Sequence, residues 1–174
     1  MYVAAVFLPL VGSLISGTLV LFKISLKESG NEDVKNHIDL ISQVITCASM
    51  LLAGVASSLV FFEVLINGQN PSIEIFTWVS SGSLQFSWAL RGDILSVLMV
   101  LMVTVVSSMI HVYSIGYMAT DKSISRFMAY LSLFTFFMLM LVSSDNLVQM
   151  FFGWEGVGLA SYLLIGFWYD RPSA

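Results

Sequence analysis

Charged residues are scarce in this sequence. Asp, Glu, Lys and Arg together make up 10% of the 174 residues, whereas about a quarter is usual in soluble domains. Hydrophobic residues reach 57%, and the mean hydropathy is +0.89. This composition excludes an ordinary water-soluble domain and predicts a membrane protein, with room for about five spanning helices joined by short connections.

Cysteine and clustered basic residues are nearly absent as well. The single cysteine, Cys47, lies within an apolar run, so it cannot form an intramolecular disulfide and indicates no metal cluster. No basic patch suggests a nucleic-acid partner. The N-terminus lacks the basic segment and short apolar core of a cleaved signal peptide, so residues 2–22 are interpreted as a true span. No pattern typical of a nucleophilic triad or a haem pair occurs, and the chain alone is expected to carry no redox chemistry.

Long apolar runs predict where the chain crosses the membrane. We expect helices at about residues 2–22, 40–62, 94–113, 127–144 and 147–169. The segment 63–93 differs, because it contains the turn signals NGQNP and SSGS and an alternating apolar pattern. That pattern predicts a β-hairpin or an extended segment at the membrane interface. The expected fold class is therefore an all-α membrane protein with a short hairpin-like segment in the 63–93 loop.

Basic residues gather in alternate connections, which predicts the orientation. If the spans alternate, one side of the membrane holds six basic residues and the other side holds one, Arg91. The six are Lys23, Lys27, Lys35, Lys122, Arg126 and Arg171. Cytoplasmic loops carry the excess of Lys and Arg. The N-terminus and the 63–93 segment are thus expected outside, and the C-terminal end is expected in the cytoplasm.

Glu155 is the main candidate for a functional residue. It lies near the middle of the fifth predicted span, and an isolated carboxylate there opposes insertion by roughly 2.5–3.5 kcal/mol. It could be a structural acid that is hydrogen-bonded to a neighbouring helix. Intramembrane acids usually mark ion paths, however, which favours a role in proton transfer. No Lys or Arg lies inside the predicted spans, so a cationic partner must come from elsewhere.

Five further polar residues are weaker candidates. His111 lies near the inner end of the third predicted span, where an interfacial histidine favours the helix dipole. A proton-relay role for His111 is the alternative, because imidazole titrates near neutral pH. Gln149 and Asp145 are expected to mark the outer mouth or the cap of the fifth span. Arg91 and Asp93 are expected to set the start of the third.

The fifth predicted span carries two strips of small residues. GWEGVG does not fit a dinucleotide-binding loop, because it follows a membrane span rather than a strand. Close helix packing is the better explanation, expected against helices encoded beyond residue 174. The strip interpreted as a packing surface is Gln149, Gly153, Gly156 and Ala160. The strip that could line a pore is Glu155, Gly158, Tyr162 and Gly166.

Several stretches together resemble one known family. GWEGVGLASYLLIGFWY at 153–169 follows SSDNLVQMF at 143–151, and LRGDILSVLM, HVYSIGYM and SRFMAYLSLF begin at Leu90, His111 and Ser125. In this order they resemble subunit L of bacterial NADH:quinone oxidoreductase, which is called chain 5 in mitochondrial complex I. The resemblance extends over essentially the whole chain. The Mrp-type sodium/proton antiporter subunits are the nearest alternative.

The resemblance implies a proton-translocating subunit of the membrane arm, which acts as an enzyme only as part of the complex. Glu155 corresponds to the family's essential acid, which pairs with a lysine in a later helix. Other membrane-arm subunits and the lipid bilayer are the implied partners, in a bacterial inner membrane. NADH, FMN, Fe–S clusters and quinone would be bound elsewhere in the complex.

Family members are several times longer, so residues 1–174 are expected to be the N-terminal part of an antiporter-like domain that stops before a sixth span. Such a part is not expected to pump protons alone. An Mrp-type cation/proton antiporter subunit and a non-catalytic structural membrane remnant remain alternatives.

Overall fold

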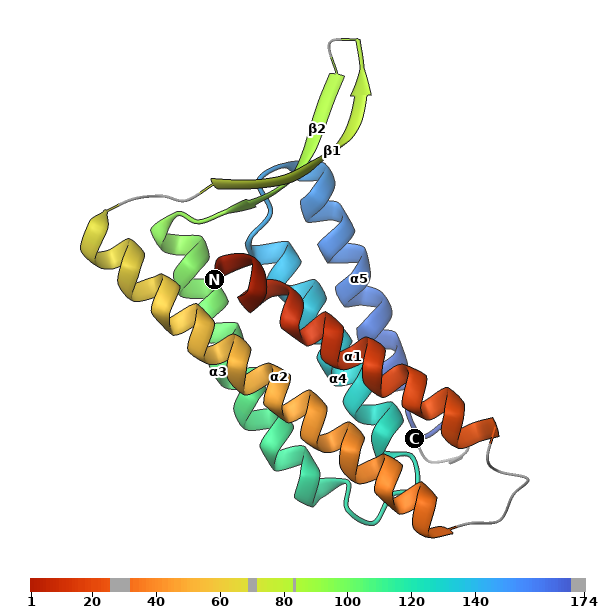
Figure 1. The fold of residues 1–174 in the computed structure, drawn as a ribbon. Coiled ribbons are helices and arrows are strands. Elements are labelled where there is room, and N and C mark those ends of the chain that lie inside the picture. The colour runs from red at the N-terminus through yellow and green to blue at the C-terminus, as the bar shows by residue number, and fades with distance from the viewer. Residues whose placement is uncertain (26–31, 69–71, 83, 170–174) are drawn as a thin grey trace.

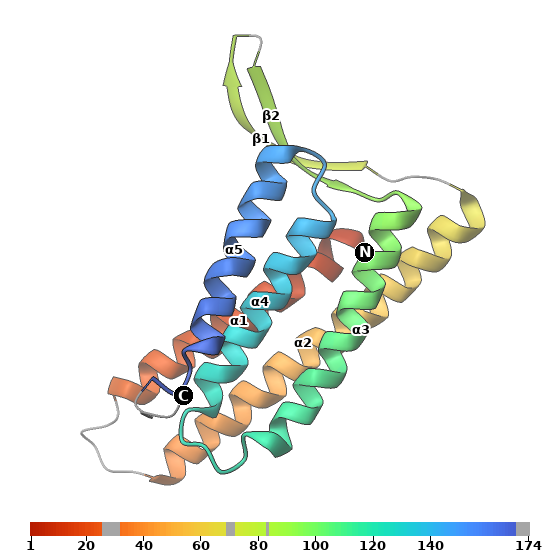
Figure 2. The same cartoon turned by 180° about the vertical axis from the view of Figure 1, so that it is seen from behind.

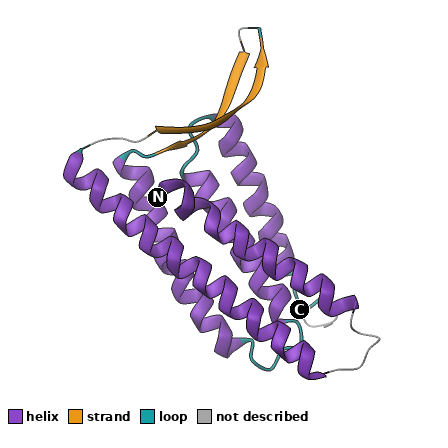
Figure 3. Cartoon of the chain, viewed as in Figure 1, coloured by secondary structure: helices purple, strands orange, loops and turns teal. Residues whose placement is uncertain are grey.

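The computed structural model describes residues 1–25, 32–68, 72–82 and 84–169, and it consists of five helices and one hairpin (Figures 1 and 3). This arrangement confirms the predicted fold class. The elements are α1 (Tyr2–Ser25), α2 (Glu32–Asn67), β1 (Ser72–Ser81), β2 (Leu84–Arg91), α3 (Ile94–Tyr117), α4 (Ile124–Val142) and α5 (Leu147–Ile165).

All five of these helices are long and apolar enough to cross a membrane. The chain is a multi-pass membrane protein, which explains why many large apolar side chains point outward. The N-terminus lies at the end of the bundle that carries the hairpin, and the last described residues lie at the opposite end (Figures 1 and 2). Lys23, Lys122 and Arg126 also belong to that opposite end. Lys27 and Arg171, two of the basic residues used for orientation, lie outside the described residues.

The helix bounds differ from the predicted spans where polar residues continue a helix. α2 begins at Glu32 rather than at 40, because Glu32 and Asp33 in its first turn complement the helix dipole. α3 runs on to Tyr117, and α4 already begins at Ile124. α5 ends at Ile165 rather than at 169, and Gly166 forms its C-cap.

The helices form a bundle in which α1 packs on α2 and α4, α2 packs on α3, and α4 packs on α5 (Figure 2). An apolar cluster fills the hairpin end of the bundle. Hydroxyl groups hold the helices together elsewhere. Ser57 Oγ lies 2.7 Å from Thr104 Oγ1, and Ser13 donates to the Ala129 carbonyl oxygen over 2.9 Å. Interhelical hydrogen bonds of this kind stabilise helix association in a membrane.

An ion pair joins three helices at the end opposite the hairpin. Lys23 Nζ lies 2.7 Å from both carboxylate oxygens of Asp39 and donates to the Lys122 carbonyl oxygen over 2.9 Å. Ser125 at the start of α4 donates to the same carboxylate. Lys23 and Asp39 are both mostly shielded from solvent. The pair therefore connects α1, α2 and the turn that leads into α4.

Strands β1 and β2 pair antiparallel and confirm the predicted hairpin. Gly82 in the connecting turn has φ +59°, a backbone conformation that favours glycine. The register shifts twice, between Glu74 and Phe76 and between Thr77 and Val79. These irregularities break the simple alternation, so Ile73 is half-buried whereas Ile75 is exposed.

Candidate functional site

Helix α5 begins immediately after a tight turn from α4. Its N-cap is Asn146, whose side-chain oxygen accepts a hydrogen bond from the Gln149 backbone N–H over 2.9 Å. Amide side chains satisfy the free N–H groups of a first helical turn in this way. Of the two residues predicted to mark the mouth or the cap, Gln149 contributes its backbone N–H to the cap, whereas the capping side chain is Asn146 rather than Asp145.

Three hydrogen bonds fasten strand β2 to the junction between α4 and α5. Asn146 Nδ2 donates to the Ser87 carbonyl oxygen over 2.7 Å, and the Ala89 N–H donates to Gln149 Oε1 over 3.1 Å. The Arg91 N–H donates to a backbone oxygen at the end of α4 over 2.8 Å. Gln149 is fully buried beneath the hairpin rather than exposed at a mouth. The helix that carries Glu155 is thus positioned by the hairpin.

The first small-residue strip of α5 is its packing face. The buried residues of α5 are those predicted, namely Gln149, Gly153, Gly156 and Ala160. A Cβ atom on Gly153 would lie 2.7 Å from the Leu141 backbone nitrogen, and one on Gly156 would overlap the Phe137 ring. These glycines let the α5 backbone approach α4 closely. The partner surface is therefore α4, and not a helix beyond residue 174 as the sequence had suggested.

Glu155 lies on the opposite, outward face of α5. It is exposed together with Gly158, Tyr162 and Gly166, the second strip. Consecutive helical residues are about 100° apart, so packing Gly156 onto α4 turns Glu155 away from it. Within the described residues, no side chain forms a hydrogen bond or an ion pair with this carboxylate.

His111 is fully buried between α3 and α4, not interfacial as the simplest interpretation of the sequence suggested. The reason is that α3 continues to Tyr117. His111 Nδ1 lies 2.8 Å from the Ser107 carbonyl oxygen, and Nε2 lies 2.9 Å from Ser132 Oγ. A carbonyl can only accept, so Nδ1 carries the proton and the Ser132 hydroxyl donates to Nε2 in the neutral state. The structure thus assigns both ring nitrogens a partner.

The two candidate titratable groups are not brought together. His111 continues into a small hydroxyl network, in which Ser107 Oγ lies 2.6 Å from Thr135 Oγ1. Helix α4 stands between α3 and α5 (Figure 2). Glu155 is exposed on α5, whereas the residues of α5 that pack on α4 are buried. Among the described residues, no group of three His, Cys, Asp or Glu side chains could hold a metal ion.

Arg91 and Asp93 mark the start of α3, as predicted. Asp93 is the N-cap of α3 and accepts a hydrogen bond from the Ser96 N–H over 2.9 Å. Arg91 Nε lies 3.4 Å from the other carboxylate oxygen. Hydrogen bonds from the side chain and backbone of Ser96, with a smaller contribution from Arg91, hold the pKa of Asp93 below its usual range. This pair has a structural role at the helix start.

Comparison with known proteins places these elements in one family. Residues 78–128 match the family model described as the N-terminus of NADH-ubiquinone oxidoreductase (complex I) chain 5. Residues 144–174, which include Glu155, match the model described as the NADH:quinone oxidoreductase/Mrp antiporter transmembrane region. The two models together cover the end of β1, all of β2 and α3, the start of α4, and α5.

Curated relatives align over most or all of the chain. NADH-quinone oxidoreductase subunit L of Rickettsia conorii is 50% identical over 134 residues, which is 77% of this chain and 20% of the relative. NADH-ubiquinone oxidoreductase chain 5 of Chondrus crispus is 45% identical, and that of Arabidopsis thaliana is 44% identical, each over all 174 residues and 24% of the relative. The chain thus spans about a quarter of the length of these relatives. On these matches, the chain belongs to the family of NADH-quinone oxidoreductase subunit L and NADH-ubiquinone oxidoreductase chain 5.

Proposed function

We propose that this chain supplies Glu155 as a proton-transfer group in the membrane arm of NADH:quinone oxidoreductase. The observation that carries the proposal is the position of Glu155, at mid-helix on the outward face of α5 and without a partner among the described residues. A carboxylate facing hydrocarbon costs roughly 2.5–3.5 kcal/mol, and such residues usually line ion paths or face a polar partner. Family membership supports the same role.

The outward face of α5 is where a cationic partner would be placed. The resemblance implies a lysine from another helix, and other membrane-arm subunits would complete the assembly. Beside a cation Glu155 is ionised, and when the cation withdraws the carboxyl takes up a proton, because an isolated charge in a membrane is costly. NADH, FMN, Fe–S clusters and quinone would be bound elsewhere in the complex. The chain would act as an enzyme only within it.

The charges at the two ends of the bundle support an orientation in the membrane. Lys23, Lys35, Lys122 and Arg126 belong to the end opposite the hairpin, whereas Arg91 lies at the hairpin end. We place the basic end in the cytoplasm and the N-terminus with the hairpin outside, in a bacterial inner membrane.

The test is Glu155→Gln in the full-length protein within its complex. This change keeps the size of the side chain but removes the titrating group, so proton translocation per electron should fall sharply. A matched control is Glu63→Gln, which removes an exposed carboxylate near the end of α2. Acidification by membrane vesicles, measured alongside quinone reduction, gives the ratio. Unchanged pumping and turnover in Glu155→Gln would refute the proposal.

Two other functions would give different results. The family model over α5 also describes Mrp antiporters, so a cation/proton antiporter subunit is the second candidate. Proton flux would then depend on sodium and not on NADH oxidation. A non-catalytic structural remnant would show assembly with neighbouring subunits but no effect of Glu155→Gln on proton flux.

A further inference from the structure

Helix α5 is attached to the rest of the bundle at both of its ends. At the hairpin end, the side chains of Asn146 and Gln149 form hydrogen bonds with strand β2. At the opposite end, Gly166 forms the C-cap, and the residues that follow it pack on the start of α4. The last described residues lie at this end of the bundle (Figure 1). The second attachment is therefore formed by the chain immediately after α5.

Phe167 is the buried part of this second attachment. It is 4% exposed and belongs to an apolar cluster with Met118, Ile124 and Met128. Its ring centre lies 5.4 Å from that of Phe127, and the two rings meet edge to face. Aromatic pairs in this arrangement contribute beyond the area that they bury. The chain after α5 is thus packed onto the junction of α3 and α4.

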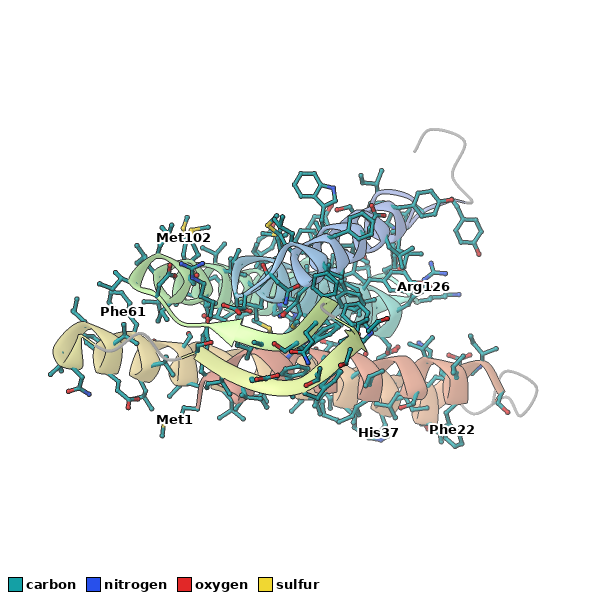
Figure 4. All side chains as sticks on the ribbon, turned by 90° about the horizontal axis from the view of Figure 1, so that it is seen from above. Met1, Phe22, His37, Phe61, Met102 and Arg126 are labelled. Carbon is teal, nitrogen blue, oxygen red and sulfur yellow. The ribbon has the colours of Figure 1, made fainter. Side chains whose placement is uncertain are left out.

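Two polar contacts complete the attachment. Arg126 Nη2 donates to the Phe167 carbonyl oxygen over 3.2 Å, and Figure 4 shows Arg126 at the periphery of the bundle. Trp168 Nε1 donates to Asp121 Oδ2 over 2.8 Å. The other oxygen of this carboxylate accepts from the Ser123 N–H over 2.8 Å. Asp121 therefore orders the turn before α4 and also holds the chain after α5. We call the residues of this attachment the α5 anchor, namely Asp121, Arg126, Phe167 and Trp168.

The middle of α5 is poorly suited to fix the position of Glu155 without such attachments. Gly153, Gly156 and Gly158 surround the acid in sequence, and glycine weakens a helix more than any residue except proline. Gly153 and Gly156 set how closely α5 approaches α4. The carboxylate lies on the other face of the helix. Its position relative to a partner outside the described chain therefore depends on the tilt and rotation of α5 as a whole, which its two ends determine.

We propose that Asp121 and Trp168 are positioning residues for Glu155. Their hydrogen bond holds one end of α5 and so sets where the carboxylate meets its partner; the inference rests on the proposed proton-transfer role. Glu155 lies nearly halfway along α5, so moving the anchored end by about 2 Å, with the hairpin end in place, moves Glu155 by about 1 Å. A misplacement of about 1 Å can slow a reaction between positioned groups by about a hundredfold.

The experiment uses the full-length protein in its complex. Infrared difference spectra with and without NADH oxidation are recorded together with the number of protons translocated per electron. Trp168→Phe keeps an aromatic ring but removes the donor, and Asp121→Ala removes the acceptor. We expect each variant to shift the turnover-dependent carboxyl band of Glu155 and to lower the proton-to-electron ratio at least about two-fold, because the acid is displaced from its partner.

Two further variants show whether the hydrogen bond itself is responsible. Asp121→Asn keeps one acceptor oxygen and should restore part of the proton-to-electron ratio that Asp121→Ala loses. Asp33→Ala is the matched control, because it removes an exposed carboxylate at the same end of the bundle, in the first turn of α2. This control should leave both the band and the ratio as they are in the unmodified protein.

Several outcomes would overturn the proposal. An unshifted band or an unchanged ratio in Trp168→Phe would do so, even if Asp121→Ala failed to assemble. An equal band shift in Asp33→Ala would show a general effect of charge at that end and reject a positioning role. A band that persists in Glu155→Gln would refute the proton-transfer role itself. Loss of the band in Glu155→Gln, with no shift in Trp168→Phe, would refute the positioning role alone.

Discussion

His111 and Glu155 are both titratable groups within membrane-spanning helices, and their surroundings are opposite. His111 is 0% exposed, and both of its ring nitrogens have partners from α3 and α4. Glu155 faces outward from α5 and has no partner among the described residues. The described part of the chain therefore supplies the hydrogen-bond partners of His111, whereas a partner for Glu155 must come from outside it. The contrast indicates that His111, whose hydrogen bonds are all made within the chain, has a structural role. The unpaired carboxylate of Glu155 remains available to exchange a proton with a partner.

The arrangement around His111 also limits what it can do as a proton relay. The best acceptor for Nδ1 is a backbone carbonyl oxygen, which cannot take up a proton and pass it on. The Ser107 hydroxyl is farther away, at 3.3 Å. A relay through His111 would have to break the shorter bond first. The proton-relay role stays a prediction, and the geometry favours the structural one.

The largest effect on stability should come from disturbing the face that turns Glu155 outward. Gly156→Val would force a side chain into the Phe137 ring, so we expect the free energy of unfolding to fall by about 1–3 kcal/mol. Gly158→Val is the matched control, because a Cβ there meets nothing within 4 Å. Unfolding by denaturing detergent measures both. Equal losses in the two variants would mean that α5 does not pack on α4 through its glycine face.

Substitutions at His111 and Glu155 should differ in their effect on the free energy of unfolding, by less than the effect of Gly156→Val. His111→Leu and Ser132→Ala each remove one side of a buried hydrogen bond, and the coupling energy in a double-mutant cycle should be about 0.6–1.7 kcal/mol. Glu155→Gln should change the free energy of unfolding by less than about 0.5 kcal/mol, because the group has no internal partner. A coupling energy of zero would show that the hydrogen bond between His111 and Ser132 does not contribute to stability, and the contrast with Glu155 would then fail.

The smallest effect concerns Asp93, an acid that is paired but lies outside the spans. Its pKa is lowered by the hydrogen bonds from Ser96, so its contribution to stability is fully present above the unfolded-state pKa of about 3.9. This contribution is lost as the pH falls through the lower pKa of the folded state. Asp93→Asn should make the free energy of unfolding, measured as a function of pH, depend less on pH in the acid range. An unchanged loss of stability at low pH in this variant would mean that another carboxylate causes it.

Local patterns predicted the spans and the packing face, and contacts far apart in sequence explain what was missed. Glycine spacing on α5 was sufficient to predict which of its faces is buried, because helical periodicity is local. His111 was placed at an interface because the apolar run weakens near Tyr113, although the helix continues. The contact of Gln149 with Ala89 joins residues 60 positions apart, and no local signal indicates it.

The central claim is that Glu155 changes its protonation while the complex turns over. Infrared difference spectroscopy of the full-length protein in its complex, recorded with and without NADH oxidation, measures this directly. We predict a protonated-carboxyl band that rises and falls with turnover, is absent in Glu155→Gln and persists in Glu63→Gln. A band that is unchanged in Glu155→Gln, or no turnover-dependent carboxyl band in the unmodified protein, would contradict the account.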